Sequence, residues 1–156
     1  MVETLNPESV IPHQGKMCLI NKIIEITDQT VSCQVSISKD DIFYRSDING
    51  VYSWVGIEYM AQTIGIYAGL RNDNPNPKKS KMGLLLSVRA FKTESSIFKL
   101  GQCLSIKGYK IYLEGNIGVF DCEIYIDNQK ICSAKLNTIL PENDQIDNIL
   151  KGKAVK

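Results

Sequence analysis

The chain has 156 residues, of which 44% are hydrophobic and 22% charged, and its formal net charge is +1. This length suits one domain with a sizeable core, and the near-neutral charge gives no indication of a nucleic-acid partner. The N-terminus, MVETLNPESV, lacks the basic patch and apolar segment of a signal peptide, and no run reaches the ~18 apolar residues of a membrane span. We therefore expect a cytoplasmic protein that does not span a membrane.

The five cysteines are odd in number, widely spaced and never arranged as Cys-x-x-Cys. This pattern argues against both a disulfide framework and a zinc site. Each lies in an apolar, strand-like run, where a free thiol behaves as a small hydrophobic residue. We expect reduced core residues at Cys18, Cys33, Cys103, Cys122 and Cys132. No metal or organic cofactor is predicted.

The first third of the chain predicts a strand pair and a loop. Residues 17–38 contain two β-rich runs, MCLINKIIEI and TVSCQVSIS, separated by a Thr-Asp-Gln turn. Residues 40–52 are polar and irregular, which favours a surface loop.

A long helix is predicted from Ser53 to about Arg71, because SWVGIEYMAQTIGIYAGLR has no proline and starts with a favoured N-cap residue. The segment is apolar on nearly every side, which is typical of a buried helix. Residues 72–81, NDNPNPKKSK, contain two prolines and end it.

Four further β-rich runs follow: GLLLSVRAF, CLSIKGYKIYLEG, IGVFDCEIYID and KICSAKLNTIL. Asp127-Asn128-Gln129 joins the last two as a tight hairpin. Two strands, one long helix and four strands predict an α+β domain whose antiparallel sheet wraps around the helix, which is the layout of a hot-dog fold. We place this domain at residues 1–141 and a polar tail at residues 142–156.

Glu58 is the only charged residue between Trp54 and Leu70, with Gln62 one turn further on the same face. A carboxylate buried without a partner usually takes up a proton, and it can then act as a general acid. An ion pair with a lysine or arginine would explain the residue equally well.

His13 is the only histidine, so any acid–base role of an imidazole falls on it, although a lone histidine is more often structural. Backbone N–H groups at Ser53 and Trp54 could stabilise an oxyanion at the helix start, or simply belong to an ordinary cap. A basic cluster of Lys78, Lys79 and Lys81, with Arg89 further on, fits either docking of an acidic carrier protein or a solvated loop.

The helix text GIEYMAQTIG resembles that of the hot-dog 3-hydroxyacyl-acyl-carrier-protein dehydratases, in which a glutamate precedes an Ala-Met-Ala-Gln or similar run. The matching residues are Glu58, Tyr59, Met60, Ala61 and Gln62. Pro12 and His13 match the family's opening Leu-Pro-His segment. Weaker likeness in a central strand region and the closing hairpin is carried by Arg89, Phe91, Gly101, Leu104 and NQKICSAKL, and extends the resemblance over residues 10–141.

One departure is large: these dehydratases carry their catalytic histidine in a Gly-His-Phe-Pro stretch before the helix, and residues 40–57 contain no histidine. The Pro-Gly pair before the family's helix is also missing, with Tyr52 and Ser53 in its place. The combined pattern resembles a divergent branch of dehydratase-like proteins associated with aryl polyene lipid clusters.

The resemblance implies dehydration of a 3-hydroxyacyl thioester on an acyl carrier protein to a 2-enoyl thioester, in fatty acid or polyene lipid biosynthesis. Glu58 would protonate the leaving hydroxyl, His13 would remove the C2 proton and Gln62 would orient Glu58. Substrate contacts would come from Ser53, Trp54 and Gln62. The resemblance also implies a homodimer or a heterodimer with another hot-dog protein. Two alternatives stay open: a non-catalytic subunit of a heterodimeric dehydratase, and an acyl thioesterase.

Overall fold

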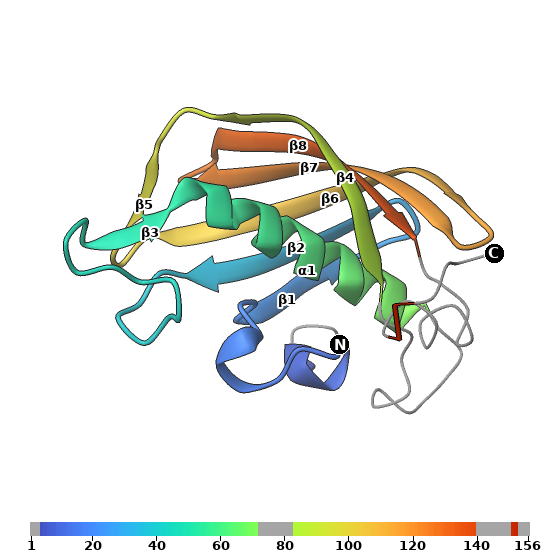
Figure 1. The fold of residues 1–156 in the computed structure, drawn as a ribbon, viewed down its shortest axis with the longest axis horizontal. Helices are drawn as coiled ribbons and strands as arrows, with labels where there is room; N and C mark the ends of the chain where they lie inside the picture. The colour runs from blue at the N-terminus through green and yellow to red at the C-terminus, as the bar shows by residue number, and fades with distance from the viewer. Residues whose placement is uncertain (1–3, 72–82, 140–150, 153–156) are drawn as a thin grey trace.

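The computed structural model describes residues 4–71, 83–139 and 151–152. Its main layer is a six-stranded antiparallel sheet in the order β1-β2-β6-β7-β8-β4. The strands are β1 Lys22–Ile26, β2 Thr30–Ser36, β4 Leu84–Thr93, β6 Cys103–Glu114, β7 Ile117–Ile126 and β8 Gln129–Ile139. One helix, α1 (Gly56–Leu70), lies against one face of this sheet (Figure 1). The predicted hot-dog fold is confirmed.

Alternation of buried and less buried residues creates the two faces of the sheet. In β7, the side chains of Phe120, Cys122 and Ile124 are buried and the residues between them are not. The turn from β7 to β8 has positive φ at Asp127 (49°) and Asn128 (64°), the backbone required by a tight two-residue hairpin loop. The hairpin predicted there is confirmed.

Helix α1 buries one side in the core and leaves the other open. Tyr59, Met60, Ile66 and Tyr67 are at most 2% exposed. Ala68, by contrast, is exposed. The prediction of a helix buried all round is therefore wrong for the single chain, because the sheet covers only one side of α1.

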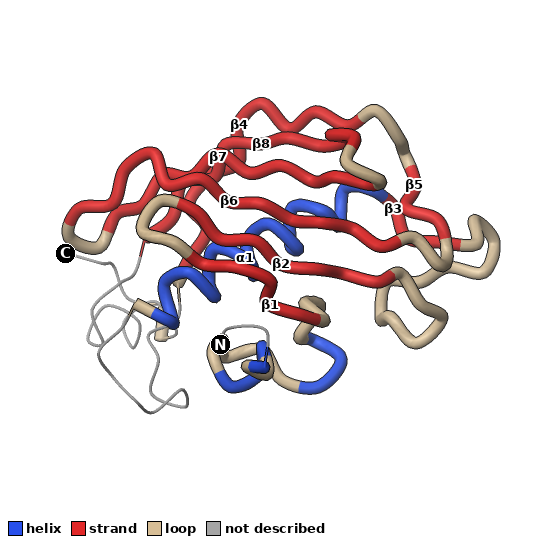
Figure 2. The backbone as a smooth tube through the Cα atoms, turned by 180° about the vertical axis from the view of Figure 1, so that it is seen from behind, coloured by secondary structure: helices blue, strands red, loops and turns tan. Residues whose placement is uncertain are grey.

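The helix also begins differently from the prediction. A short 3-10 turn, η4 (Ser53–Val55), precedes α1, and the N-cap position of α1 is Val55 without a side-chain cap. Just before this turn, β3 (Gly50–Tyr52) pairs with β5 (Ile97–Lys99) in a separate two-stranded sheet. This small sheet, visible at one end of the molecule in Figure 2, was not predicted from the sequence.

An N-terminal arm, residues 4–21, runs beside α1 and β1 before the first strand (Figure 1). It contains the 3-10 turns η2 (Pro7–Ser9) and η3 (Gly15–Met17). Val10, Ile11, Leu19 and Ile20 of this arm are buried, so the arm is part of the packed structure.

The cysteine prediction holds in part. All five thiols are free, and Cys33, Cys122 and Cys132 are buried. Cys18 is half-buried and Cys103 is exposed, so these two are not core residues of the single chain. The predicted boundary at residue 141 lies outside the described residues. No helix in the described ranges is long and apolar enough to cross a membrane.

Candidate active site

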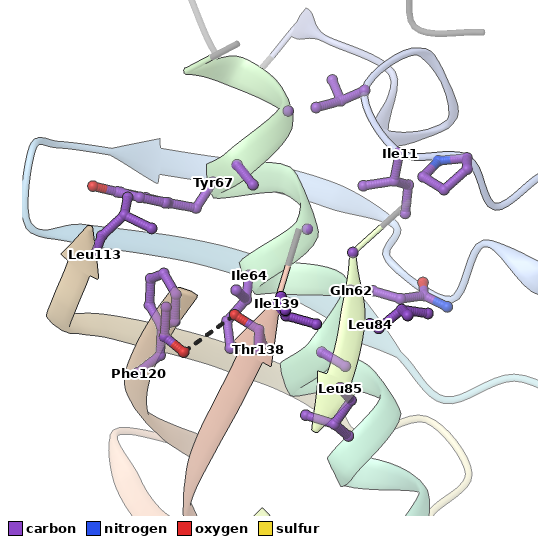
Figure 3. Close-up of a pocket in the computed structure, with 18 of the residues that line it drawn as sticks. Ile11, Gln62, Ile64, Tyr67, Leu84, Leu85, Leu113, Phe120, Thr138 and Ile139 are labelled. Atoms are coloured by element: carbon purple, nitrogen blue, oxygen red, sulfur yellow. Dashed lines mark hydrogen bonds between the residues drawn. The ribbon is translucent and has the colours of Figure 1, made fainter. Parts of the chain in front are cut away.

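A cavity of about 510 Å³ lies between the N-terminal arm, α1 and one end of the sheet. Its size falls within the range of small-molecule sites. The arm contributes residues 10–13, and α1 contributes Glu58 and Gln62 together with the small residues Ala61, Gly65 and Ala68. In Figure 3, Tyr67, Leu113 and Phe120 gather on one side of the cavity and Gln62 and Leu84 on the other. The walls are mainly apolar, with few polar groups.

The two predicted acid–base residues meet at this cavity. The His13 Nε2 atom lies 3.6 Å from Glu58 Oε1, and the two side chains are 34% and 43% exposed. At 3.6 Å the contact is too long for a hydrogen bond. Catalytic contacts are often long before a substrate binds and shorten in the complex. An imidazole and a carboxylate from one chain therefore border the same cavity.

Gln62 fixes both partners of this pair. Its side chain is almost fully buried, at 1% exposure. The Gln62 Nε2 group donates to Glu58 Oε1 at 3.0 Å and to the carbonyl oxygen of Met17 at 2.9 Å. The Gln62 Oε1 atom accepts from the backbone N–H of Leu19 at 2.8 Å. One amide thus orients the Glu58 carboxylate and attaches the arm that carries His13.

Both contacts of Glu58 converge on Oε1. Among the described residues no side chain binds Oε2, so that oxygen is available to a ligand in the cavity. No described lysine or arginine pairs with Glu58, so the alternative of a structural ion pair with a basic residue finds no support there. The predicted burial of Glu58 is wrong for the single chain, because Glu58 lies on the open side of α1.

His13 has an unsatisfied ring nitrogen. Its Nδ1 atom is buried and has no hydrogen-bond partner among the described residues. Burying a polar atom without a hydrogen-bond partner costs free energy. In native proteins such an atom usually has a functional role or binds a water molecule or an ion. This nitrogen therefore marks a place where a substrate or a second chain can contribute a hydrogen bond.

The predicted helix-start contacts do not join this site. The Ser53 N–H donates to the carbonyl oxygen of Ser96 at 2.9 Å, so it is not free for an oxyanion. Neither Ser53 nor Trp54 lines the cavity. The N–H of Ser53 is thus already paired in this structure, and the oxyanion role of Ser53 and Trp54 stays a prediction.

The predicted carrier-docking residues are only partly placed. Lys78, Lys79 and Lys81 lie outside the described residues. Arg89 is exposed on β4 and does not line the cavity.

Other cavity residues were not singled out from the sequence. Val10 and Ile11 of the arm, Leu113 of β6, Phe120 of β7 and Thr138 of β8 line it. The Thr138 hydroxyl donates to the carbonyl oxygen of Gly118 at 3.3 Å, drawn as the dashed line in Figure 3. In the sequence these residues look like ordinary core positions, because only the three-dimensional fold brings these strands and the arm to one cavity.

Comparison with known proteins agrees with this architecture. The chain is 25% identical over 144 residues to 3-hydroxyacyl-acyl-carrier-protein dehydratase FabZ of Campylobacter lari, covering 90% of this chain and 98% of that protein. A chain of the dehydratase heterocomplex ApeI:P from Xenorhabdus doucetiae superposes with a TM-score of 0.83 at 27% identity, covering 94% of this chain and 97% of that chain.

A more distant likeness shows the fold alone. A hypothetical thioesterase of Streptococcus pneumoniae, solved with coenzyme A, gives a TM-score of 0.58 at 15% identity over 76% of this chain and 86% of that chain.

Fold and relatives together place the protein among the hot-dog proteins of the dehydratase type. Within that class, a family model described as ApeP-like, ApeP dehydratase, matches residues 5–151. The chain belongs to this ApeP-like family. The resemblance inferred from its helix and its Pro-His segment is thereby confirmed.

Proposed function

We propose that the protein dehydrates a 3-hydroxyacyl thioester, carried by an acyl carrier protein, to the 2-enoyl thioester. The observation that carries the proposal is the His13–Glu58 pair, 3.6 Å apart at the border of an apolar cavity. The family match and the FabZ relatives support the same reaction class.

In the proposed mechanism, His13 removes a proton from C2 while Glu58, as the general acid, delivers a proton to the C3 hydroxyl. The C3–O bond breaks, water leaves and a C2–C3 double bond forms. Gln62 holds Oε1 of Glu58, so Oε2 is the oxygen that we assign to the hydroxyl. The short distance between the two side chains lets the proton taken up by His13 return to Glu58 and restore the starting state.

The cavity accommodates the acyl chain in this proposal. From Glu58 to Gly69 the helix rises about 16 Å at 1.5 Å per residue, and residues at both ends of this stretch line the cavity. Its far side is formed by Tyr67, Leu113 and Phe120, which are apolar or aromatic. An extended hydrocarbon chain can lie along this stretch with its thioester near His13.

Mass spectrometry of a 3-hydroxyacyl carrier protein incubated with the purified protein tests the reaction. Loss of 18 mass units from the acyl group is the expected result. Release of the free acid from the carrier, without that loss, would identify a thioesterase and contradict the proposal. If the acyl carrier protein stays unchanged with the protein alone, the assay is repeated with a co-encoded hot-dog partner.

A second candidate is a subunit that completes a heterodimeric dehydratase without doing chemistry. Two observations favour it: residues 40–57 lack a histidine, and a similar solved chain belongs to the ApeI:P heterocomplex. The buried His13 Nδ1 atom without a partner also fits a site completed by another chain. Activity that needs the partner and survives loss of both His13 and Glu58 would establish this second function.

For the assembly itself, we propose that a second hot-dog chain packs against β4 and the open side of α1. β4 is an edge of the sheet, and Leu85 and Leu86 on it are 41% and 59% exposed. Exposed apolar side chains on an unpaired edge strand favour pairing with another chain. The five free thiols fit a reducing compartment, so we propose a cytoplasmic location.

A further inference from the structure

The N-terminal arm is attached to α1 at two places, and His13 lies between them. At one place, Gln62 binds the backbone of Met17 and Leu19. At the other, Val10 lies directly on the helix backbone at Gly69. A methyl group at Gly69 would come within 2.6 Å of the Val10 carbonyl oxygen and 2.9 Å of Val10 Cγ1. The approach of the arm at this point therefore requires a residue without a side chain.

Gly65, one turn earlier on the same helix face, behaves differently. A methyl group there would lie 3.4 Å from Ile11 Cγ2, which is an ordinary van der Waals contact. Both glycines line the cavity, and neither has a positive φ, so alanine fits the helix backbone at either position. Alanine also raises helix propensity at both positions. The two positions thus form a matched pair that differs in how closely the arm approaches.

The C-terminal end of α1 is fixed by hydrogen bonds to the turn between β1 and β2. The Tyr67 hydroxyl donates to the carbonyl oxygen of Asp28 at 2.7 Å. The Arg71 guanidinium donates to the Thr27 carbonyl oxygen at 2.6 Å and to the Asp28 carboxylate at 2.8 Å. These bonds tie the last turn of the helix to the turn between β1 and β2. A group added at Gly69 therefore displaces the arm rather than the helix.

A displacement of Val10 also displaces His13, because a hydrogen bond links the residues on either side of the segment that contains both. The Gln14 side chain donates to the carbonyl oxygen of Glu8 at 2.8 Å, which links the two ends of the segment that contains Val10 and His13. The Val10 N–H also donates to the Pro7 carbonyl oxygen at 2.9 Å. These two bonds couple the position of Val10 to that of His13.

We infer that Gly69 is a positioning residue: by admitting the arm against the helix backbone, it sets the distance between His13 and Glu58. The glycine touches neither reacting group and acts only through the arm. Its consequence for catalysis rests on the proposed function, but its consequence for the position of the imidazole does not.

Because His13 is the only histidine in the sequence, its imidazole can be observed alone. We would record imidazole NMR spectra of tag-free, ¹⁵N-histidine-labelled full chain for the wild type, Glu58→Gln, Gly65→Ala and Gly69→Ala. Glu58→Gln shows how the resonances change when the carboxylate is lost. Gly69→Ala is expected to move them toward those of Glu58→Gln, and Gly65→Ala to leave them at the wild-type positions. Wild-type resonances in Gly69→Ala, or equal shifts in both alanine variants, would overturn the inference.

Val10→Ala tests, without altering the helix, whether the contact between the arm and Gly69 positions the imidazole. It remains a test if Gly69→Ala does not fold. It removes the side-chain methyls with which the arm rests against Gly69. The same resonances are expected to move from their wild-type positions, because the arm loses its side-chain contact with the helix. An unchanged spectrum for Val10→Ala would count against the inference.

Activity separates the inference from the proposed function. Gly69→Ala is expected to lower kcat at least about tenfold with little change in KM, since misplacement by about 1 Å can cost up to a hundredfold. In a His13→Ala background the Gly69→Ala change is expected to have no further effect. An equal loss in both backgrounds would show that Gly69 does not act through His13. If the wild type dehydrates nothing, either alone or with a co-encoded hot-dog partner, the proposed function fails, and the NMR spectra still decide where Gly69 places the imidazole.

Discussion

At the scale of single residues, Gln62 does most to organise the site. It makes three hydrogen bonds from a position that is 1% exposed, and each of them reaches a group that defines the site. A buried amide whose donors and acceptor are all paired contributes more to stability than the sum of its single hydrogen bonds, because its loss leaves backbone groups unsatisfied. Gln62 therefore links the stability of the arm to the geometry of Glu58.

Gln62→Leu is expected to lower the free energy of unfolding by about 1–3 kcal/mol, because the Leu19 N–H and the Met17 carbonyl lose their partner. Urea unfolding measures this change. Gln62→Glu is the matched variant: it keeps an acceptor for Leu19 and removes the donor to Glu58. Wild-type stability of Gln62→Leu would show that this amide does not hold the arm.

The thiols provide a second prediction at this scale. Burial raises the pKa of Cys33 from its ordinary value of 9.0 to about 12, and it also raises the pKa of Cys122 and Cys132. These cysteines stay protonated at neutral pH, as does the half-buried Cys18, whose pKa burial also raises, whereas Cys103 is exposed. We expect one fast-reacting thiol with a disulfide reagent in the native protein, and its loss in Cys103→Ser. Several fast thiols in the native state would contradict the burial.

The same shift predicts how stability depends on pH. A raised thiol pKa means that the native state holds its proton more tightly than the unfolded chain. The stabilisation is therefore complete below pH 9 and is lost as the pH rises toward 12. We expect the free energy of unfolding to fall between pH 9 and 11, by up to about 1.4 kcal/mol per pH unit for each such thiol. Urea unfolding across this range measures it, and Cys33→Ala should flatten the slope. A constant value from pH 8 to 11 would contradict the prediction.

At the scale of elements, the small sheet of β3 and β5 holds the start of α1. Gly50 of β3 lies directly against the carbonyl oxygen of Phe98 in β5, and a Cβ at Gly50 would overlap that oxygen. The Phe98 ring in turn packs against Tyr59 of α1, with ring centroids 6.0 Å apart. The pairing of β3 with β5 therefore positions the helix turn that carries Glu58.

Gly50→Ala is expected to destabilise the protein by about 1–3 kcal/mol, as overpacking against a fixed neighbour does. Thermal unfolding gives the measurement. Gly83→Ala is the control, because a Cβ at Gly83 would have no neighbour within 4 Å. Equal melting temperatures for the two variants would show that β3 and β5 tolerate a gap between them.

The elements that could be predicted from the sequence are those encoded by neighbouring residues. The turn at Asp127 and Asn128 and the strands around it follow from neighbouring residues, so the pattern indicated them correctly. The pairing of Val51 with Phe98 joins two three-residue strands far apart in the chain, and no local pattern encodes it. The site shows the same division: the helix spacing places Gln62 beside Glu58, but the approach of His13 depends on the tertiary path of the arm.

At the scale of the whole molecule, the single chain leaves apolar surface where a partner is proposed. Leu86 on β4, Trp54 at the helix start and Met17 on the arm are 59%, 58% and 57% exposed. Exposed apolar side chains on an unpaired edge strand, as at Leu86, are typical of a surface that another chain covers.

Leu86→Asp is expected to weaken this assembly, because pairing would bury a charge at the interface. Size-exclusion chromatography with light scattering should show a smaller species than the wild type, with circular dichroism unchanged. Ile111→Asp is the control: Ile111 is 54% exposed on β6, which β7 and β8 separate from β4. An assembly that persists in Leu86→Asp and dissociates in Ile111→Asp would place the interface elsewhere.

We propose that His13 and Glu58 of this chain perform the elimination. The most direct measurement is the single-turnover rate of water loss from a 3-hydroxyacyl carrier protein, with the chain in its active assembly and His13→Ala or Glu58→Gln introduced only in this chain. Each change is expected to lower the rate at least about a hundredfold, as removal of a general acid or base does. A rate that survives both changes would contradict it and make the chain a structural subunit.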